Sequence, residues 1–218
     1  MLTSQMVRVI AIGLRDTLYM TVVSTAMAYI IGLPLGILLV VTKRKGIMPC
    51  IGLNKGLNTI VNILRSVPFL ILLIAVMPIT RYIVGTSIGA AATIVPLVIA
   101  AFPFVGRLVE SSGDEVEKGM VEAAQSMGAT TLQIIFRVLI KEAFPSLIKG
   151  ASIAITTILG YSAMAGIVGG GGLGDIAIRY GYYRYQNDVM IVTVIILIVL
   201  VQIFQGLGNI SSQRTNKK

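Results

Sequence analysis

Nearly uncharged apolar runs alternate with short charged segments along most of the chain. About 17–25 apolar residues in a helix cross the roughly 30 Å hydrocarbon layer of a bilayer. Runs of suitable length and composition occupy 17–42, 57–80, 90–106, 150–174 and 189–213. The pattern therefore predicts an all-α membrane protein with five transmembrane helices, in a single domain over 1–218 with its core at about 13–208.

Glycine and proline indicate where these helices bend or stop. Pro68 follows Arg65 in the second run, and an arginine there is expected near a helix end, from which it reaches the membrane interface. The sequence 85–89 predicts a short turn. Four successive glycines at 169–172 argue against one continuous helix through the end of the fourth run. The polar segment 175–188 carries four tyrosines, which suit the head-group level.

The long charged interval 107–149 contains a short amphipathic helix pattern. Gly128 ends this pattern with the residue type that adopts the left-handed conformation of a helix C-terminus. A small apolar stripe at helical spacing precedes it, formed by Met120, Ala123, Ala124 and Met127. The stripe is too short to fold alone, and its alanines allow close approach of another backbone. We interpret it as a docking helix; an ordinary amphipathic surface helix is the alternative.

A second helix is expected directly after the first. Thr130 and Gln133 have the spacing of a capping box, and Pro145 is expected to end this helix. Its apolar stripe consists of Leu132, Ile135, Phe136, Leu139 and Ile140. The acidic residues of 107–149 are interpreted mainly as a solvated helical face, with Asp114 and Glu117 capping a turn.

Composition and charge place the chain in a membrane and orient it. The chain is 56% hydrophobic and 12% charged, with a mean hydropathy of +0.89. Its net charge of +9 could suggest nucleic acid, but the basic residues flank apolar runs, which favours lipid head groups. One side of the membrane would hold 12 Lys and Arg, in 43–55, 107–149 and the C-terminal tail, against five on the other, with Arg65 left out. The positive-inside rule therefore places 107–149 and the C-terminus in the cytoplasm, and the N-terminus outside.

The sequence offers no chemistry for an energy source. It contains no His, no phosphate-binding Gly-x-x-x-x-Gly-Lys-Ser/Thr motif, and only one cysteine, Cys50. We expect no catalytic residue, metal site or cofactor site in this chain. A separate cytoplasmic subunit is then expected to hydrolyse ATP-Mg and to act on the docking helix. An ATPase dimer would need two such helices, which predicts a permease homodimer.

The residues of the docking helix resemble the cytoplasmic loop of ABC importer permeases. Glu122, Ala123, Ala124 and Gly128 match its Glu-Ala-Ala-x-x-x-Gly pattern. Val138 and Ile140 stand for the Ile and Leu of the following Ile-x-Leu-Pro, whose proline position holds Lys141. Further blocks of sequence are similar to methionine importer permeases, and the similarity runs from about residue 16 to residue 201. These blocks are 65–69, 78–81, 84–89, 160–164 with the glycine run, and 181–182.

This resemblance implies a type-I ABC importer permease, of the binding-protein-dependent transport family, that carries methionine into the cell. It implies a cell-membrane complex of a permease homodimer, two cytoplasmic ATPase subunits and an extracytoplasmic substrate-binding protein. It also implies that the ATPase groove receives the residues Glu122, Ala123, Ala124, Met127 and Gly128.

The fourth span lines the central pathway in this family, so Met164 becomes a candidate gate, with Tyr161 and Ser162 beside it. Plain packing is the alternative for Met164, since most methionines in apolar helices fill space. Two other functions stay open at this point. One is the same architecture for another amino acid or a quaternary-amine osmolyte, and the other is a stand-alone carrier or pore.

Overall fold

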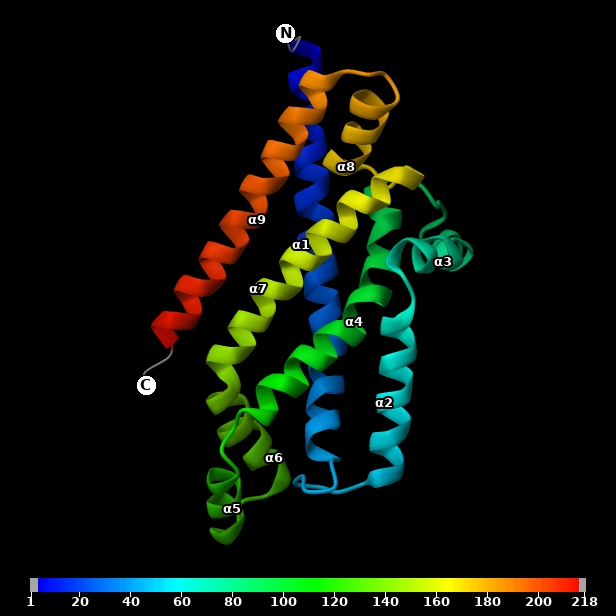
Figure 1. Ribbon diagram of the computed structural model, residues 1–218. Coiled ribbons are helices and arrows are strands. Elements are labelled where there is room, and N and C mark those ends of the chain that lie inside the picture. Colours follow the sequence, from blue (N-terminus) through cyan, green and yellow to red (C-terminus); the bar gives the residue numbers. More distant parts are fainter. Residues whose placement is uncertain (1–3, 216–218) are drawn as a thin grey trace.

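The computed structural model describes residues 4–215, which form helices joined by short turns, with no strand in this range (Figure 1). The α-helices are α1 (Ser4–Val41), α2 (Ile51–Ser66), α3 (Phe69–Val84), α4 (Ala90–Asp114), α5 (Lys118–Ser126), α6 (Thr131–Ile134), α7 (Ile140–Ala165), α8 (Gly172–Ile176) and α9 (Asn187–Thr215). A π-helical turn, Ile135–Leu139, joins α6 to α7, and another, Ala177–Tyr182, follows α8. Lys217 and Lys218, which entered the charge count, lie outside the described residues.

The centre of the bundle is the crossing of α1 with α4. Gly32 and Gly36 allow the backbones to approach, because a Cβ on Gly36 would lie 2.5 Å from the Cβ of Val109. Small residues permit such close helix contacts in membrane proteins. The surrounding core is apolar and includes Met20 of α1, Leu97 and Val105 of α4, Leu73 of α3 and Ile158 of α7.

Within residues 4–215, four helical segments are long and apolar enough to cross a membrane, and five if α2 and α3 together make one span. The second expected span, 57–80, is divided between α2 and α3, which meet at an angle of 103°. Val67 before Pro68 is extended, as the residue before a proline usually is. The expected second span over 57–80 is thus made of two helices, because the chain turns at this proline.

Pro145 does not end a helix, contrary to the sequence-based expectation. It lies inside α7, which runs from Ile140 to Ala165 and packs against α4 and α9. The Pro145 carbonyl accepts a hydrogen bond from Ser212 Oγ of α9, at 3.0 Å. A proline removes one backbone donor, and neighbouring helices make this tolerable inside a membrane helix.

The glycine positions that were expected to interrupt helices do so. Gly85 and Gly89 have φ values of +82° and +95° and bound the short turn between α3 and α4. In the glycine run, Gly169, Gly171 and Gly172 also have positive φ, and α8 begins there after α7 has ended. The broken helix predicted at 169–172 is thus confirmed.

The segment between the long helices is shorter than the predicted interval 107–149. Its first part continues α4 to Asp114, and its last part opens α7 from Ile140. The part between them carries α5 and α6 and lies at one end of the bundle, far from the N-terminus (Figure 1).

Candidate functional site

The turn between α5 and α6 has the predicted local structure. Gly128 has φ +77°, and its N–H donates to the Gln125 carbonyl at 2.9 Å, which closes the end of α5. The Thr130 side chain accepts from the Gln133 N–H, and the Gln133 side chain accepts from the Thr130 N–H. The predicted glycine terminus and capping box are both confirmed.

The apolar stripe of α5 is divided between the protein interior and the surface. Ala124 is only 6% exposed and faces its own chain. Glu122, Ala123, Met127 and Gly128 are exposed, Met127 to 81%. The structure thus leaves four of the five predicted docking residues accessible, whereas Ala124 anchors α5.

The stripe of the second helix is divided in the same way. Ile135 and Leu139 are buried in a small cluster with Val41 of α1. Leu132 and Phe136 instead remain 66% and 62% exposed. Together with Met127 they form an exposed apolar group around the α5–α6 turn. We call these three residues, Met127, Leu132 and Phe136, the apolar tip.

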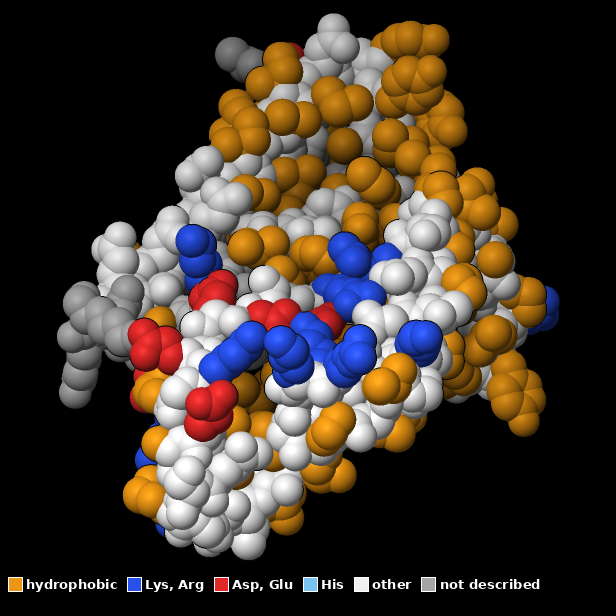
Figure 2. All heavy atoms as spheres, turned by 60° about the horizontal axis from the view of Figure 1, so that its bottom comes forward, with side chains coloured by type: hydrophobic (Ala, Val, Ile, Leu, Met, Phe, Trp, Pro, Cys, Tyr) orange, Lys and Arg blue, Asp and Glu red, His pale blue; other side chains and the backbone are white. Residues whose placement is uncertain are grey.

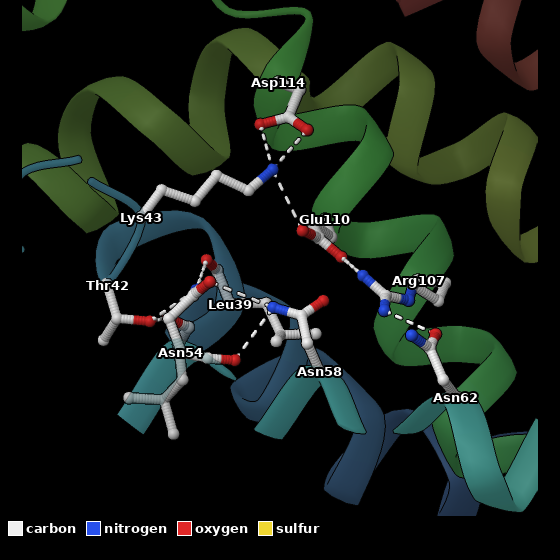
Figure 3. Close-up of polar contacts among 10 residues, drawn as sticks. Leu39, Thr42, Lys43, Asn54, Asn58, Asn62, Arg107, Glu110 and Asp114 are labelled. Atoms are coloured by element: carbon white, nitrogen blue, oxygen red, sulfur yellow. Dashed lines mark hydrogen bonds and ion pairs between the residues drawn. The ribbon is translucent and has the colours of Figure 1, made fainter. Parts of the chain in front are cut away.

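A cluster of charges lies behind the apolar tip, where α1 and α4 end. Lys43 Nζ lies 2.9 Å from Glu110 Oε1 and 2.5 Å from Asp114 Oδ2. The Arg107 guanidinium donates to the other oxygen of Glu110, and its Nη2 donates to Asn62 Oδ1 at 2.7 Å (Figure 3). These five residues, Lys43, Asn62, Arg107, Glu110 and Asp114, form what we call the charge cluster.

Sequence reasoning missed the charge cluster. It assigned the acidic residues of this region mainly to a solvated face, but the Glu110 side chain is only 9% exposed. The available signal was the i,i+3 spacing of Arg107 and Glu110 directly after an apolar run. Asp114 ends α4 and binds Lys43, and no turn cap by Asp114 with Glu117 is seen.

The electrostatics of Lys43 reflect two opposing effects. Partial burial lowers the pKa of its ammonium group, but the hydrogen bonds to Asp114 and Glu110 outweigh this, so the pKa is raised above its ordinary value of 10.5. Lys43 is therefore charged throughout the physiological range, and its two ion pairs persist there.

A cavity of about 540 Å³ opens between this cluster and α5. Its charged lining consists of Lys43, Lys45, Asp114, Lys118 and Glu122. Figure 2, which turns the α5 end of the bundle forward, shows acidic and basic side chains gathered across this face. Among the described residues, no group of three or more His, Cys, Asp or Glu is placed to hold a metal ion.

The three pathway candidates at the end of α7 lie in different surroundings. Met164 is 49% exposed. The Tyr161 ring stacks on Phe69 of α3, with ring centres 4.4 Å apart and planes 4° from parallel. Ser162 is only 1% exposed, and its hydroxyl donates to the Leu159 carbonyl at 2.8 Å. Met164 is thus accessible, whereas Ser162 faces the protein interior, because neighbouring residues of a helix point in different directions.

Two threonines hold the glycine run against the bundle. Thr17 Oγ1 of α1 accepts from the Leu173 N–H at 2.8 Å and donates to the Gly13 carbonyl. Thr93 Oγ1 of α4 lies 3.1 Å from the Gly170 carbonyl and donates to it. The broken helix that follows α7 is therefore bonded to both α1 and α4.

Comparison with known proteins gives a consistent result over almost the whole chain. The family of binding-protein-dependent transport system inner membrane components matches residues 32–217. The probable D-methionine transport system permease protein MetI of Vibrio cholerae is 54% identical over 203 residues, which cover 93% of this chain and 90% of the relative. The D-methionine transport system permease protein MetI of Escherichia coli K12 is 49% identical over 154 residues, 71% of each chain.

Solved structures agree with this result. A chain of the MetNI methionine ABC transporter, in an inward-facing conformation, superposes with a TM-score of 0.97 at 44% identity, covering 99% of this chain and 100% of that one. A chain of an amino acid ABC transporter gives a TM-score of 0.79 at 19% identity, over 96% of this chain and 95% of that one, and so shares the fold.

Proposed function

The chain belongs to the family of binding-protein-dependent transport system inner membrane components, and from this premise we propose that it is the permease subunit of an ATP-driven importer of methionine. The observation that carries the proposal is its likeness to D-methionine permeases over 93% of its length. The MetNI fold at a TM-score of 0.97 supports the same substrate class. Methionine would cross the cell membrane into the cytoplasm.

Energy for transport comes from a separate ATPase subunit that binds at α5. The apolar tip supports this role, because Met127, Leu132 and Phe136 expose large apolar side chains at a charged end of the protein. Glu122 and Ala123 of α5 and Gly128 just after it are also exposed and complete the docking surface. ATP-Mg is bound and hydrolysed on the partner, and this chain is not itself an enzyme.

The working complex contains two copies of this chain, two ATPase subunits and an extracytoplasmic substrate-binding protein. The charge distribution supports an orientation with the α5 end in the cytoplasm and the N-terminus outside. Within this complex, Met164 and Tyr161 at the end of α7 border the methionine pathway. Exposure of half of the Met164 side chain supports this place for it.

Reconstitution tests the transport proposal directly. The chain is purified with its ATPase, placed in liposomes and supplied with the binding protein, labelled methionine and internal ATP. We expect ATP-dependent accumulation that unlabelled methionine competes away, while other amino acids and quaternary amines compete poorly. Accumulation by the chain alone, or preference for another solute, would contradict the proposal.

Cysteine labelling tests the orientation. Cys50 is the only cysteine, so Cys50→Ala provides a background without thiols. Met127→Cys and Tyr185→Cys then report on two positions that are 81% and 87% exposed. In intact cells a membrane-impermeant maleimide should label position 185 alone. Labelling of position 127 instead would show that the chain has the opposite orientation.

A further inference from the structure

We infer that Glu110 is a positioning residue of the transport cycle, whose buried carboxylate connects α4 to α1 directly and to α2 through Arg107. The inference rests on the proposed function, because it concerns how movement of α5 reaches the spanning helices. It gives the charge cluster a role that docking at α5 does not by itself require.

The carboxylate uses both of its oxygens, in different directions. Oε1 pairs with Lys43, which follows the end of α1, at 2.9 Å. Oε2 accepts from Arg107, one turn earlier on α4. A buried charge is stable only when it is well paired, and Lys43 and Arg107 together supply a partner for each oxygen of Glu110.

Arg107 extends the connection to α2. Its second terminal nitrogen donates to Asn62 Oδ1 at 2.7 Å. The planar guanidinium can serve two acceptors at once, and the Glu110 carboxylate fixes its plane. Figure 3 shows this row from Lys43 through Glu110 and Arg107 to Asn62, with members from α2, α4 and the end of α1.

The helix α2 has little buried surface, so polar contacts contribute to its attachment. Val61 is the one residue of α2 that is buried in the described chain. Asn54 attaches α2 to the end of α1, because its amide donates to the Leu39 carbonyl and to Thr42 Oγ1, both at 2.9 Å. The contact between Arg107 and Asn62 is therefore a polar link from α2 to α4.

The position of the cluster fits the transmission of movement. The helix α4 ends at Asp114, and α5 begins at Lys118, so a displacement of α5 reaches α4 through three residues. The close packing of Gly36 on Val109 carries α1 along with α4. The α2–α3 pair follows only as far as its own contacts allow, and the link from Arg107 to Asn62 supplies one of them.

Loss of the Glu110 charge should affect α2 in particular. With Glu110→Gln, Lys43 keeps Asp114 as a partner, at 2.5 Å. Arg107 instead loses the charged acceptor that orients it, because the glutamine carbonyl is neutral, and its contact with Asn62 weakens. The change thus loosens α2 from α4 while the contact of α1 with α4 is retained.

The experiment measures methionine imported per ATP hydrolysed by the reconstituted complex. Glu110→Gln should lower this ratio about tenfold with ATPase activity retained. A hydrogen bond to a charged group changes the equilibrium between the bonded and the separated state by a factor of roughly 10 to 100. The matched control is Asp114→Asn, which removes the same charge from the same partner but touches neither Arg107 nor Asn62. It should stay within about twofold of the unaltered complex.

A second pair of variants covers the case in which Glu110→Gln does not assemble. Asn62 is exposed, so its replacement leaves the core unchanged. Asn62→Leu should lower the ratio of methionine imported to ATP hydrolysed. Asn62→Asp, which keeps an acceptor for Arg107, should leave this ratio at the value of the unaltered complex. Asn58→Ala on the same helix serves as control, because Asn58 bonds only to Asn54 in the described structure.

Three results would overturn the inference. The first is an unchanged ratio of methionine imported to ATP hydrolysed in both Glu110→Gln and Asn62→Leu. The second is an Asp114→Asn variant whose ratio falls as far as that of Glu110→Gln. The third is a lower yield of complex with an unchanged ratio, which would indicate a structural role alone. Failure of the proposed function is distinguishable from these, since the unaltered complex itself would then show no ATP-dependent methionine uptake.

Discussion

Phe136 is the side chain of the apolar tip on which the docking proposal can be measured most directly. It is 62% exposed in the described chain although it belongs to the apolar stripe of a helix. Full burial of a phenylalanine side chain is worth about 1.5–3 kcal/mol. Covering its exposed fraction with a partner would therefore contribute about 1–2 kcal/mol, so Phe136→Ala should weaken ATPase binding roughly five- to thirtyfold at each docking site.

The assay is titration of the purified ATPase subunit onto the detergent-solubilised permease, read as a dissociation constant. Tyr82→Ala is the matched control, because Tyr82 is 92% exposed and belongs to α3, which lies away from α5 (Figure 1). Both variants should unfold at the temperature of the unaltered chain, since neither aromatic ring is in the core. Unchanged ATPase binding by Phe136→Ala, or an equal loss in Tyr82→Ala, would refute docking at the apolar tip.

Three further predictions concern the backbone, the helix crossing and the charge cluster. Gly128→Leu should lower ATP-driven uptake roughly five- to thirtyfold while membrane insertion persists, because φ +77° costs about 1–2 kcal/mol for an L-residue; Gly128→Asn, which tolerates this region, should retain most uptake. Gly36→Ala should lower the melting temperature, since its Cβ would lie 2.5 Å from that of Val109 and overpacking costs about 1–3 kcal/mol, whereas Gly56→Ala, with open space around it, should not. The raised pKa of Lys43 means that its stabilising contribution is complete below pH 10.5 and is lost as pH rises through the folded-state pKa. The difference in melting temperature between Lys43→Met and the unaltered chain should thus be constant from about pH 6 to 9 and shrink only in strong alkali.

The sequence predicted those elements that depend on local chemistry. Long apolar runs identified α1, α4 and α9, and the turn at 128–133 followed from a glycine and a capping pair. Proline was the unreliable signal. Pro68 follows the extended Val67 at a break between helices, whereas Pro145 lies inside α7 with its carbonyl bonded to Ser212 of α9, a tertiary contact that the local sequence does not show.

The candidate site could be predicted only in part, since its members meet through tertiary structure. The docking residues Glu122 to Gly128 are contiguous in the sequence, so their pattern can be recognised from the sequence alone. Lys43 and Glu110 are far apart in the chain and meet only because α1 and α4 cross closely. Periodicity likewise grouped Ala124 with Met127, but it cannot tell which side of a short helix faces its own bundle; packing buries Ala124 alone.

Leu132 and Phe136 of the apolar tip lie on the same helical run as the pathway candidates, and this continuity bears on how a small movement becomes a large one. From Thr131 to Ala165 the chain is helical without a break, through α6, a π-helical turn and α7. At 1.5 Å per residue this run is roughly 50 Å long, so a tilt of about 5° around its α6 end moves the Met164 end by about 4 Å. The Ile135–Leu139 π-helical turn is the place where the run can bend, because its hydrogen bonds are not those of a regular α-helix. The Thr17 and Thr93 bonds hold the glycine run beyond α7 to α1 and α4, so the far end of the run can move only as far as these two helices follow it.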